Sequence, residues 1–357
     1  MNIKSLLIGS AAALAAVSGA QAADAIVAAE PEPMEYVRVC DAFGTGFFYI
    51  PGTETCLKIG GFVRFQTGFG RADEPYAEFG SNGLRNSDDD SDWDSFTRVD
   101  INFDARTDTE LGTLRSYVNI EADANSQEEH GSFAIDEAFI ELGGFKVGHF
   151  YSWWDSGING ETDSLGNKTR FNSIAYTYDG GTWRAGLSLD EIENADEGYI
   201  KPDRWNHHNI GVAGTVGFSL GGVNLDVLGG YDTGAEDGAI RAILSAEVGP
   251  GTLQVAGIWA SNPNTYWDAS EWSVAASYAF KATEKLTITP GVQYFDNLWD
   301  GATGFNGDSK AWRVGLTVGY EVVSGLNVLG TVDYNKVDYA GTKDDFTRGF
   351  LRLQRDF

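Results

Sequence analysis

The carboxylates of residues 151–163 are the side chains of this sequence with the clearest potential for chemistry. Asp155, Glu161 and Asp163 lie close together between two segments in which polar and apolar residues alternate. Carboxylates that face basic side chains across a narrow aqueous passage create a transverse field, which orders water and disfavours apolar solutes. If this segment folds inward, the three residues are predicted to line such a passage. The alternative is an external loop.

The basic side chains that could oppose these carboxylates share one property. Each alternates with apolar residues along its segment, which places it on the polar face of a strand. Rings of acidic and basic side chains select among the ions that pass a pore. If the acidic segment lies outside, the same bases would pair with carboxylates of the strands instead. The bases are Lys58, Arg64, Arg98, Arg106, Arg115, Arg313, Arg348 and Arg352.

Two further patterns resemble known sites but lack parts that those sites need. Residues 88–94 are rich in aspartate, but with Asp90 as the first ligand of an EF-hand, Ser95 stands where glycine is required and Ile101 where glutamate is required. We interpret this run as a solvated loop. Residues 217–221 match the nucleophile pattern of hydrolases, yet another strand follows where that fold needs a helix. The sequence therefore predicts no catalytic residue, no metal site and no cofactor.

Alternating segments are the elements that must position the charged side chains. In residues 311–321, Trp312, Val314 and Tyr320 share one face, while Arg313 and Thr317 share the other. The pattern recurs in residues 272–280, 286–294 and 326–334. Aromatic residues such as Trp312 and Tyr320 end the apolar face, as expected at the two interfaces of a membrane. The alternation predicts strands with one face toward lipid and the other toward water.

Short and long connections alternate between these segments. In bacterial barrels the short turns face the periplasm and the long loops face outside. Counting the segments gives about sixteen strands, a number that leaves an aqueous channel. The sequence thus predicts an all-β, transmembrane antiparallel β-barrel, with a soluble sandwich or propeller as the alternative. The predicted long loops are residues 71–95, 123–132, 151–170, 191–206, 232–238, 261–270, 296–309 and 336–345.

The beginning of the chain has the pattern of an export signal. Residues 1–22 combine Lys4, an apolar run and the cleavage sequence Ala20-Gln21-Ala22. We predict that residues 23–55 form an N-terminal periplasmic segment and that residues 56–357 form the barrel. Cys40 and Cys56 are the two cysteines of the chain, and an oxidising periplasm favours a disulfide between them.

The formal net charge of −27 excludes nucleic acid as a partner, because binding its phosphates requires a basic surface. Loss of Lys4 with the signal would make the chain more negative still. The excess acid either keeps the surface solvated or gathers in outer loops that attract cations, and the sequence leaves both open. After the signal, no apolar run approaches the length that a spanning helix needs.

Five stretches resemble the alphaproteobacterial outer-membrane porins, a family of general diffusion porins. They are EYVRVCD at residues 35–41, FYIPGTETC at 48–56, ELGTL at 110–114, AFIELGGFKVG at 138–148 and RLQRDF at 352–357. The resemblance implies a sixteen-stranded barrel, a homotrimer, passive diffusion of small hydrophilic solutes and ions, and a third long loop that folds into the barrel. It does not extend to the outer loops, so it implies no particular solute.

An outer-membrane location would bring the chain into contact with outer-membrane lipid and lipopolysaccharide, to which the aspartate-rich run could bind through cations. Phe357 ends an alternating strand and is expected to act as an assembly signal. Three other functions stay open at this stage. A solute-specific channel would need an aromatic ladder or a continuous basic track, an outer-membrane hydrolase would need a serine and a histidine at one height, and an adhesin would act through its loops.

Overall fold

The computed structural model describes residues 38–70, 92–125, 133–192, 207–299, 301, 304–339 and 341–357. The predicted signal peptide, most of the predicted periplasmic segment and most of the acidic runs at 88–94 and 191–197 lie outside the described residues. Residues 39–357 form one compact unit. In the described part of the chain, no helix is long and apolar enough to cross a membrane.

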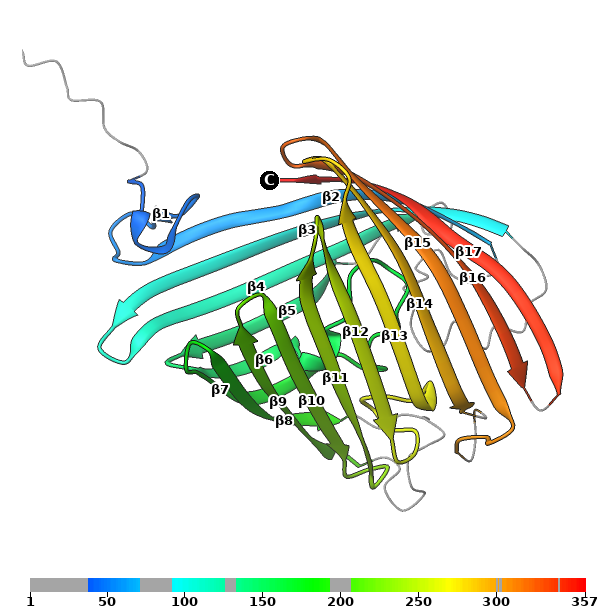
Figure 1. Ribbon diagram of the computed structural model, residues 1–357. Coiled ribbons are helices and arrows are strands. Elements are labelled where there is room, and N and C mark those ends of the chain that lie inside the picture. Colours follow the sequence, from blue (N-terminus) through cyan, green and yellow to red (C-terminus); the bar gives the residue numbers. More distant parts are fainter. Residues whose placement is uncertain are drawn as a thin grey trace, which may run out of the picture. The chain divides into compact units, whose positions relative to one another are not determined.

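Sixteen strands, β2 to β17, form a closed antiparallel barrel (Figure 1). Each strand pairs with its neighbours in the sequence, and β17 pairs with β2 to close the ring. The predicted fold class and strand number are confirmed. The strands are β2 (Cys56–Gly70), β3 (Asp92–Thr109), β4 (Gly112–Asn125), β5 (Phe133–Leu142), β6 (Phe145–Tyr151), β7 (Arg170–Asp179), β8 (Trp183–Ile192), β9 (Asn209–Leu220), β10 (Val223–Asp232), β11 (Asp237–Val248), β12 (Gly251–Ala260), β13 (Ser270–Lys281), β14 (Leu286–Leu298), β15 (Ser309–Val323), β16 (Leu326–Tyr339) and β17 (Thr342–Asp356).

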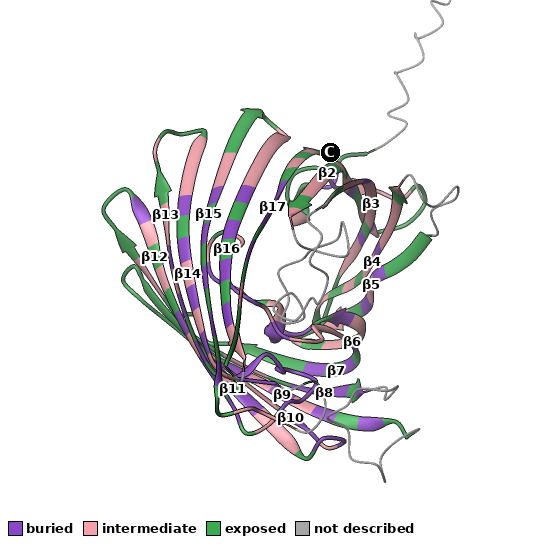
Figure 2. Cartoon of the chain, turned by 90° about the vertical axis from the view of Figure 1, so that its right-hand side faces the viewer, coloured by how far each residue is buried: buried purple, intermediate pink, exposed green. Residues whose placement is uncertain are grey.

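Alternation along the strands sends apolar side chains outward and polar side chains inward. In β15, Trp312, Val314 and Leu316 are exposed, whereas Arg313 and Thr317 are buried. Buried and exposed residues alternate in the same way along β16 (Figure 2). A soluble sheet would hide its apolar face in a core, so an exposed apolar face around the whole barrel fits a hydrocarbon environment.

Tight glycine turns connect neighbouring strands at one end of the barrel, called here the turn end. Gly143 and Gly144 have φ values of 57° and 91°, and Gly221 and Gly222 have the same two values. Two-residue hairpin turns of this hand need positive φ at both positions, which glycine adopts without strain. The hydrolase-like pattern at residues 217–221 runs into the second of these turns and continues as β10, so it is a hairpin and not a nucleophile elbow.

Two connections predicted as long loops are short turns instead. Strands β16 and β17 pair as far as Tyr339 and Thr342, so most of residues 336–345 is strand. Likewise β10 ends at Asp232 and β11 begins at Asp237. For residues 336–345 the prediction was wrong because β16 continues past its last outward aromatic residue, Tyr334, and beyond that point both faces carry polar residues such as Asn335 and Lys336.

The predicted disulfide between Cys40 and Cys56 is present, with a Cα–Cα distance of 6.0 Å. Both cysteines are buried, and they pack against Phe47 in a small apolar cluster. The short strand β1 (Phe48–Tyr49) pairs with the beginning of β2 beside them. The disulfide therefore ties the segment that precedes the barrel to the first residue of its first strand.

The main apolar cluster lies inside the barrel, where large aromatic side chains of two loops pack against inward-facing residues of the strands. Trp154 comes from residues 152–169, called here the inner loop, and Tyr266 and Trp267 come from residues 261–269, called here the companion loop. All three side chains are fully buried. The cluster also contains Phe295 of β14, whose side chain is on the inward face. In this molecule, packing inside the lumen takes the place that a core between layers has in a soluble protein.

Candidate functional site: the channel lining

The inner loop connects β6 to β7 and is held against inward-facing side chains of distant strands. The amide of Glu161 donates to Oγ1 of Thr317 in β15 at 3.0 Å, and the amide of Ser164 donates to Oε1 of Gln293 in β14 at 2.8 Å. Satisfying loop amides with wall side chains lets irregular backbone lie away from bulk water. The loop thus reaches from β6 to strands on another part of the wall.

Asp163 anchors this loop through a buried ion pair. Its Oδ2 lies 2.6 Å from Nη2 of Arg241 in β11 and also accepts the amide hydrogen of Ile158 at 3.1 Å. The side chains of Asp163 and Arg241 are 4% and 1% exposed. Burial raises the pKa of the Asp163 carboxyl, while the charge of Arg241 acts in the opposite direction. That Asp163 lines the passage stays a prediction: it borders a cavity beside the inner loop, and its carboxylate is paired with Arg241.

Arg313 and Arg348 are likewise buried instead of facing open lumen. Nε of each lies 3.4 to 3.5 Å from Oδ2 of Asp333 in β16, and none of the three side chains is more than 3% exposed. Nη1 of Arg313 also donates to the carbonyl of Thr162 at 3.2 Å. Their predicted place at the passage is corrected, because the inner loop covers Arg313 and the shared carboxylate binds Arg348.

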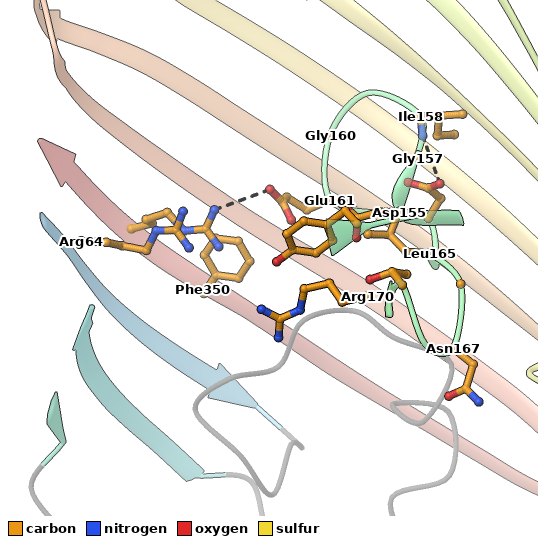
Figure 3. Close-up of a pocket in the computed structure, with 15 residues that line it drawn as sticks. Arg64, Asp155, Gly157, Ile158, Gly160, Glu161, Leu165, Asn167, Arg170 and Phe350 are labelled. Atoms are coloured by element: carbon orange, nitrogen blue, oxygen red, sulfur yellow. Dashed lines mark hydrogen bonds and ion pairs between the residues drawn. The ribbon is translucent and has the colours of Figure 1, made fainter. Parts of the chain in front are cut away.

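Arg64 and Arg352 line a cavity that the inner loop also borders. Figure 3 shows Arg64 and Phe350 on the side of the cavity opposite Glu161 and Asp155 of the loop. Nη1 of Arg352 lies 3.9 Å from Oε1 of Glu161, and these side chains are 19% and 32% exposed. They border a cavity of about 540 Å³ between the loop and the wall strands β2 and β17. Other residues that line this cavity include Tyr151, Asp155, Leu165, Asn167, Arg170 and Phe350.

Neutral groups are among the partners that orient the two arginines. Nε of Arg64 donates to Oε1 of Gln354, and Nε of Arg352 donates to Oε1 of Gln66, both at 2.7 Å. Each guanidinium also lies 4.5 Å from the centre of the aromatic ring two residues before it on the same strand. An amide or a ring orients a guanidinium without cancelling its charge. This part of the wall therefore presents two oriented positive groups toward the loop.

The remaining predicted bases lie elsewhere on the inward face. Arg98 of β3 stands opposite Arg64 of β2. It is paired with Asp123 at 2.7 Å and with Glu121 at 3.0 Å. Arg106 and Arg115 both bind Asp104, at 2.7 and 3.0 Å. Lys58 stands opposite Asp104 in the β2–β3 pairing. Arg106 and Arg115 thus share one carboxylate nearer the turn end, with Lys58 on the neighbouring strand. That these three bases oppose the inner loop stays a prediction.

Phe357 closes the barrel through its backbone. Its amide donates to the carbonyl of Gly61 at 3.0 Å, and the amide of Gly61 donates back at 3.2 Å. The expected role of Phe357 as an assembly signal stays a prediction.

Two basic residues of this site were not predicted. Arg241 sits between the outward residues Ile240 and Ala242 of β11, so the alternation rule that selected the other bases would also have selected it. Arg170 is the first residue of β7, where the inner loop ends; it pairs with Asp136 and lines the cavity. Arg170 stands at a loop boundary, where the alternation of the strand has only begun, so the sequence pattern did not indicate that its side chain faces inward.

A closed barrel with an outward apolar face and charged, polar side chains on its inward face defines a channel protein of the outer membrane. The comparisons identify its family. The model of the porin subfamily matches residues 24–350. The chain is 55% identical to a putative outer membrane protein, y4fJ, of Sinorhizobium fredii, over 100% of this chain and 99% of that protein. It is 34% identical to the porin Omp2b of Brucella neotomae, over 100% of both chains.

The fold of a solved structure agrees with this assignment. The trimer form of OmpT, an outer membrane protein of Vibrio cholerae, is similar with a TM-score of 0.57 and 11% identity, over 85% of this chain and 100% of that one. The chain belongs to the porin subfamily. It is an outer-membrane β-barrel that forms a diffusion channel, and its family consists of channels and not of enzymes, as predicted.

Proposed function

We propose that the inner loop narrows this channel to a charged constriction, at which Asp155 and Glu161 face Arg64 and Arg352. Small hydrophilic solutes and ions would pass it by diffusion. The observation that supports the proposal most directly is the separation of 3.9 Å between Glu161 Oε1 and Arg352 Nη1 at the edge of the cavity, with both side chains partly exposed. At that distance the two charges attract each other while water still reaches both.

The electrostatics of this constriction should produce a modest preference for cations. Glu161 and Asp155 attract cations, whereas Arg64 and Arg352 attract anions, so the local charges nearly balance. The net charge of −27 then favours cations, because the negative surface as a whole attracts them toward the channel mouths. Salt screens that long-range attraction over about 10 Å at 0.1 M, so the preference should fade as salt rises.

Single-channel recording in planar bilayers tests the constriction. The variant with Arg64→Gln and Arg352→Gln removes both wall charges and keeps hydrogen-bonding side chains at both positions. We expect the reversal potential in a KCl gradient to shift toward the cation potential. Arg184→Gln is the matched control, because Arg184 lies near the turn end, pairs with Asp226 at 2.6 Å and is 57% exposed. Equal reversal potentials in the wild type and the double variant would refute the constriction.

We also propose that the protein assembles as a homotrimer, and the trimer form of the similar barrel OmpT of Vibrio cholerae supports this. The outward faces of β2, β3 and β17 near Gly61 and Ala105 are the proposed contact. A Cβ at Gly61 would lie 2.0 Å from the carbonyl oxygen of Asp100, so this spot stays without a side chain and the surface stays low. Lipopolysaccharide is the proposed neighbour of the remaining outward surface. Chemical cross-linking in native outer membranes should yield trimers, and monomers alone would exclude this assembly.

A further inference from the structure

The companion loop joins β12 to β13 and also turns into the barrel. The amide of Asn167 donates to the carbonyl of Tyr266 at 3.1 Å, and the amide of Lys168 donates to the carbonyl of Thr265 at 3.0 Å. These bonds hold the returning end of the inner loop against another loop instead of the barrel wall. The position of the inner loop at this end therefore depends on where the companion loop lies.

Tyr266 fixes the companion loop in turn. Its side chain is fully buried, and its ring centre lies 5.9 Å from that of Trp154 in the inner loop and 5.7 Å from that of Phe171 in β7. Its hydroxyl donates to Oδ2 of Asp190 in β8 at 2.7 Å. One side chain thus contacts both loops and the wall, and it is directed by a hydrogen bond to a charged acceptor.

Two buried carboxylates of the wall receive hydrogen bonds from the companion loop. Asp190 and Asp232 are 1% and 0% exposed. Oδ2 of Asp232 accepts the amide of Thr265 at 3.1 Å and its hydroxyl at 2.6 Å. Within the part of the chain that the structure describes, neither carboxylate forms an ion pair with a base. Withdrawal of the loop would remove these donors from buried charges, which makes an undocked loop costly.

Two glycines of the wall leave the space that the Tyr266 side chain occupies, called here the Tyr266 socket. A Cβ at Gly211 in β9 would lie 2.1 Å from the hydroxyl oxygen of Tyr266, and a Cβ at Gly230 in β10 would lie 2.5 Å from its ring. Both positions face inward, and any larger residue would push the tyrosine out. At the adjacent Gly229, which faces outward, a Cβ would meet nothing within 4 Å.

We propose that the companion loop is a strut that holds the inner loop at a fixed distance from the facing wall, with Tyr266 as its positioning residue. The strut sets the size and steadiness of the passage without touching the solute. This proposal rests on the proposed constriction and adds a reason why the inner loop that forms it stays in place. Its prediction is that damage to the Tyr266 socket changes how steadily the channel conducts and leaves the charges of the passage in place.

The test uses three variants of the full chain in planar bilayers: Gly211→Ala, Tyr266→Phe and the two combined. Tyr266→Phe loses the hydrogen bond to Asp190 and keeps the ring. Transitions between conductance sublevels should become about tenfold more frequent. That ratio corresponds to a loss of about 1.4 kcal/mol in the stability of the docked loop. Gly211→Ala should be more disruptive, because its Cβ collides with the hydroxyl. The combined variant should behave much more like Tyr266→Phe than like Gly211→Ala, because the 2.1 Å contact with the hydroxyl is gone. The contacts that remain, 2.9 Å to Cδ1 of Ile192 and 3.0 Å to the ring carbon Cζ, are looser.

The same recordings separate this proposal from the constriction. Gly229→Ala is the control and should behave as the wild type. The strut would be overturned if both single variants kept the wild-type frequency of sublevel transitions. It would also be overturned if the combined variant showed the sum of the two single changes in that frequency. The reversal potentials of the Arg64→Gln, Arg352→Gln variant test the constriction independently. If Gly211→Ala yields no folded barrel, recovery of folding in the combined variant supports the strut, and failure of that variant while Tyr266→Phe folds overturns it.

Discussion

Replacing Glu161 by glutamine removes one negative charge from the proposed constriction and keeps the size of the side chain. The Glu161 side chain is 32% exposed, and its Oε1 lies 3.9 Å from Nη1 of Arg352. The backbone anchor at this residue is its amide, which donates to Thr317 and does not involve the carboxylate. The substitution should therefore change the field that an ion meets and leave the inner loop in place.

The magnitude follows from Coulomb's law. A unit charge about 5 Å from a passing monovalent ion contributes about 0.8 kcal/mol in water. A Debye length of about 10 Å at 0.1 M salt reduces this to about 0.5 kcal/mol. In the variant the cation loses this attraction and the anion loses an equal repulsion, so the ratio of their permeabilities changes by about 1 kcal/mol. That corresponds to about a fivefold shift toward anions.

The assay is the reversal potential of single channels in a KCl gradient. Glu247→Gln is the control, since it removes the same charge nearer the turn end, where Glu247 accepts a hydrogen bond from Thr252 at 2.9 Å. The shift for Glu161→Gln should also shrink as both salt concentrations are raised at a constant ratio. An unchanged permeability ratio, or an equal shift in the control, would show that Glu161 is not at the narrow point.

Three further predictions follow from the buried contacts. Asp163→Asn leaves Arg241 buried without its partner at a cost of about 3–5 kcal/mol; conductance should become larger and noisier with little change in ion preference, and a pure selectivity shift would contradict this. Replacing Cys40 and Cys56 by serine should lower the free energy of unfolding by about 3 kcal/mol in denaturant titrations in detergent, and an unchanged midpoint would count against it. Burial and the Asp190 carboxylate raise the pKa of the Tyr266 hydroxyl, so the stability it contributes is present below pH about 10 and falls as pH rises further. Sublevel transitions should increase there in the wild type and not in Tyr266→Phe.

Alternation in the sequence predicted the strands and the inward faces because it is a local property. The side chain period of a strand is two, so Arg64 and Arg352 could be placed on the inward face without knowledge of their neighbours. The same rule failed at residues 336–345. Polar residues on both faces are typical of a loop, but they are equally typical of a strand end that extends beyond the apolar band, so the pattern could not distinguish the two. The fold class followed from many such segments, and one misread boundary did not change it.

The contacts of the site depend on depth and register, which alternation does not contain. All eight predicted bases share the right face, yet the height of each in a tilted barrel decides whether it meets the inner loop. Arg106 and Asp104 meet near the turn end, while Arg352 reaches Glu161. The partner of Asp163, Arg241, is 78 residues away in the sequence, and no local pattern links them. Charged partners across the lumen therefore had to come from the structure.

The anchors of the inner loop have a consequence for the order in which the molecule is built. Its bond to Arg241 spans 78 residues and its bond to Thr317 spans 156. Until β11 and β15 are in place, the loop has nothing to dock against, and bringing such distant segments together is slow because chain entropy must be lost first. We therefore expect the proposed narrowing of the channel to come late in folding, after β11 and β15 have joined the barrel. A barrel whose inner loop has not yet docked should conduct more than the finished one.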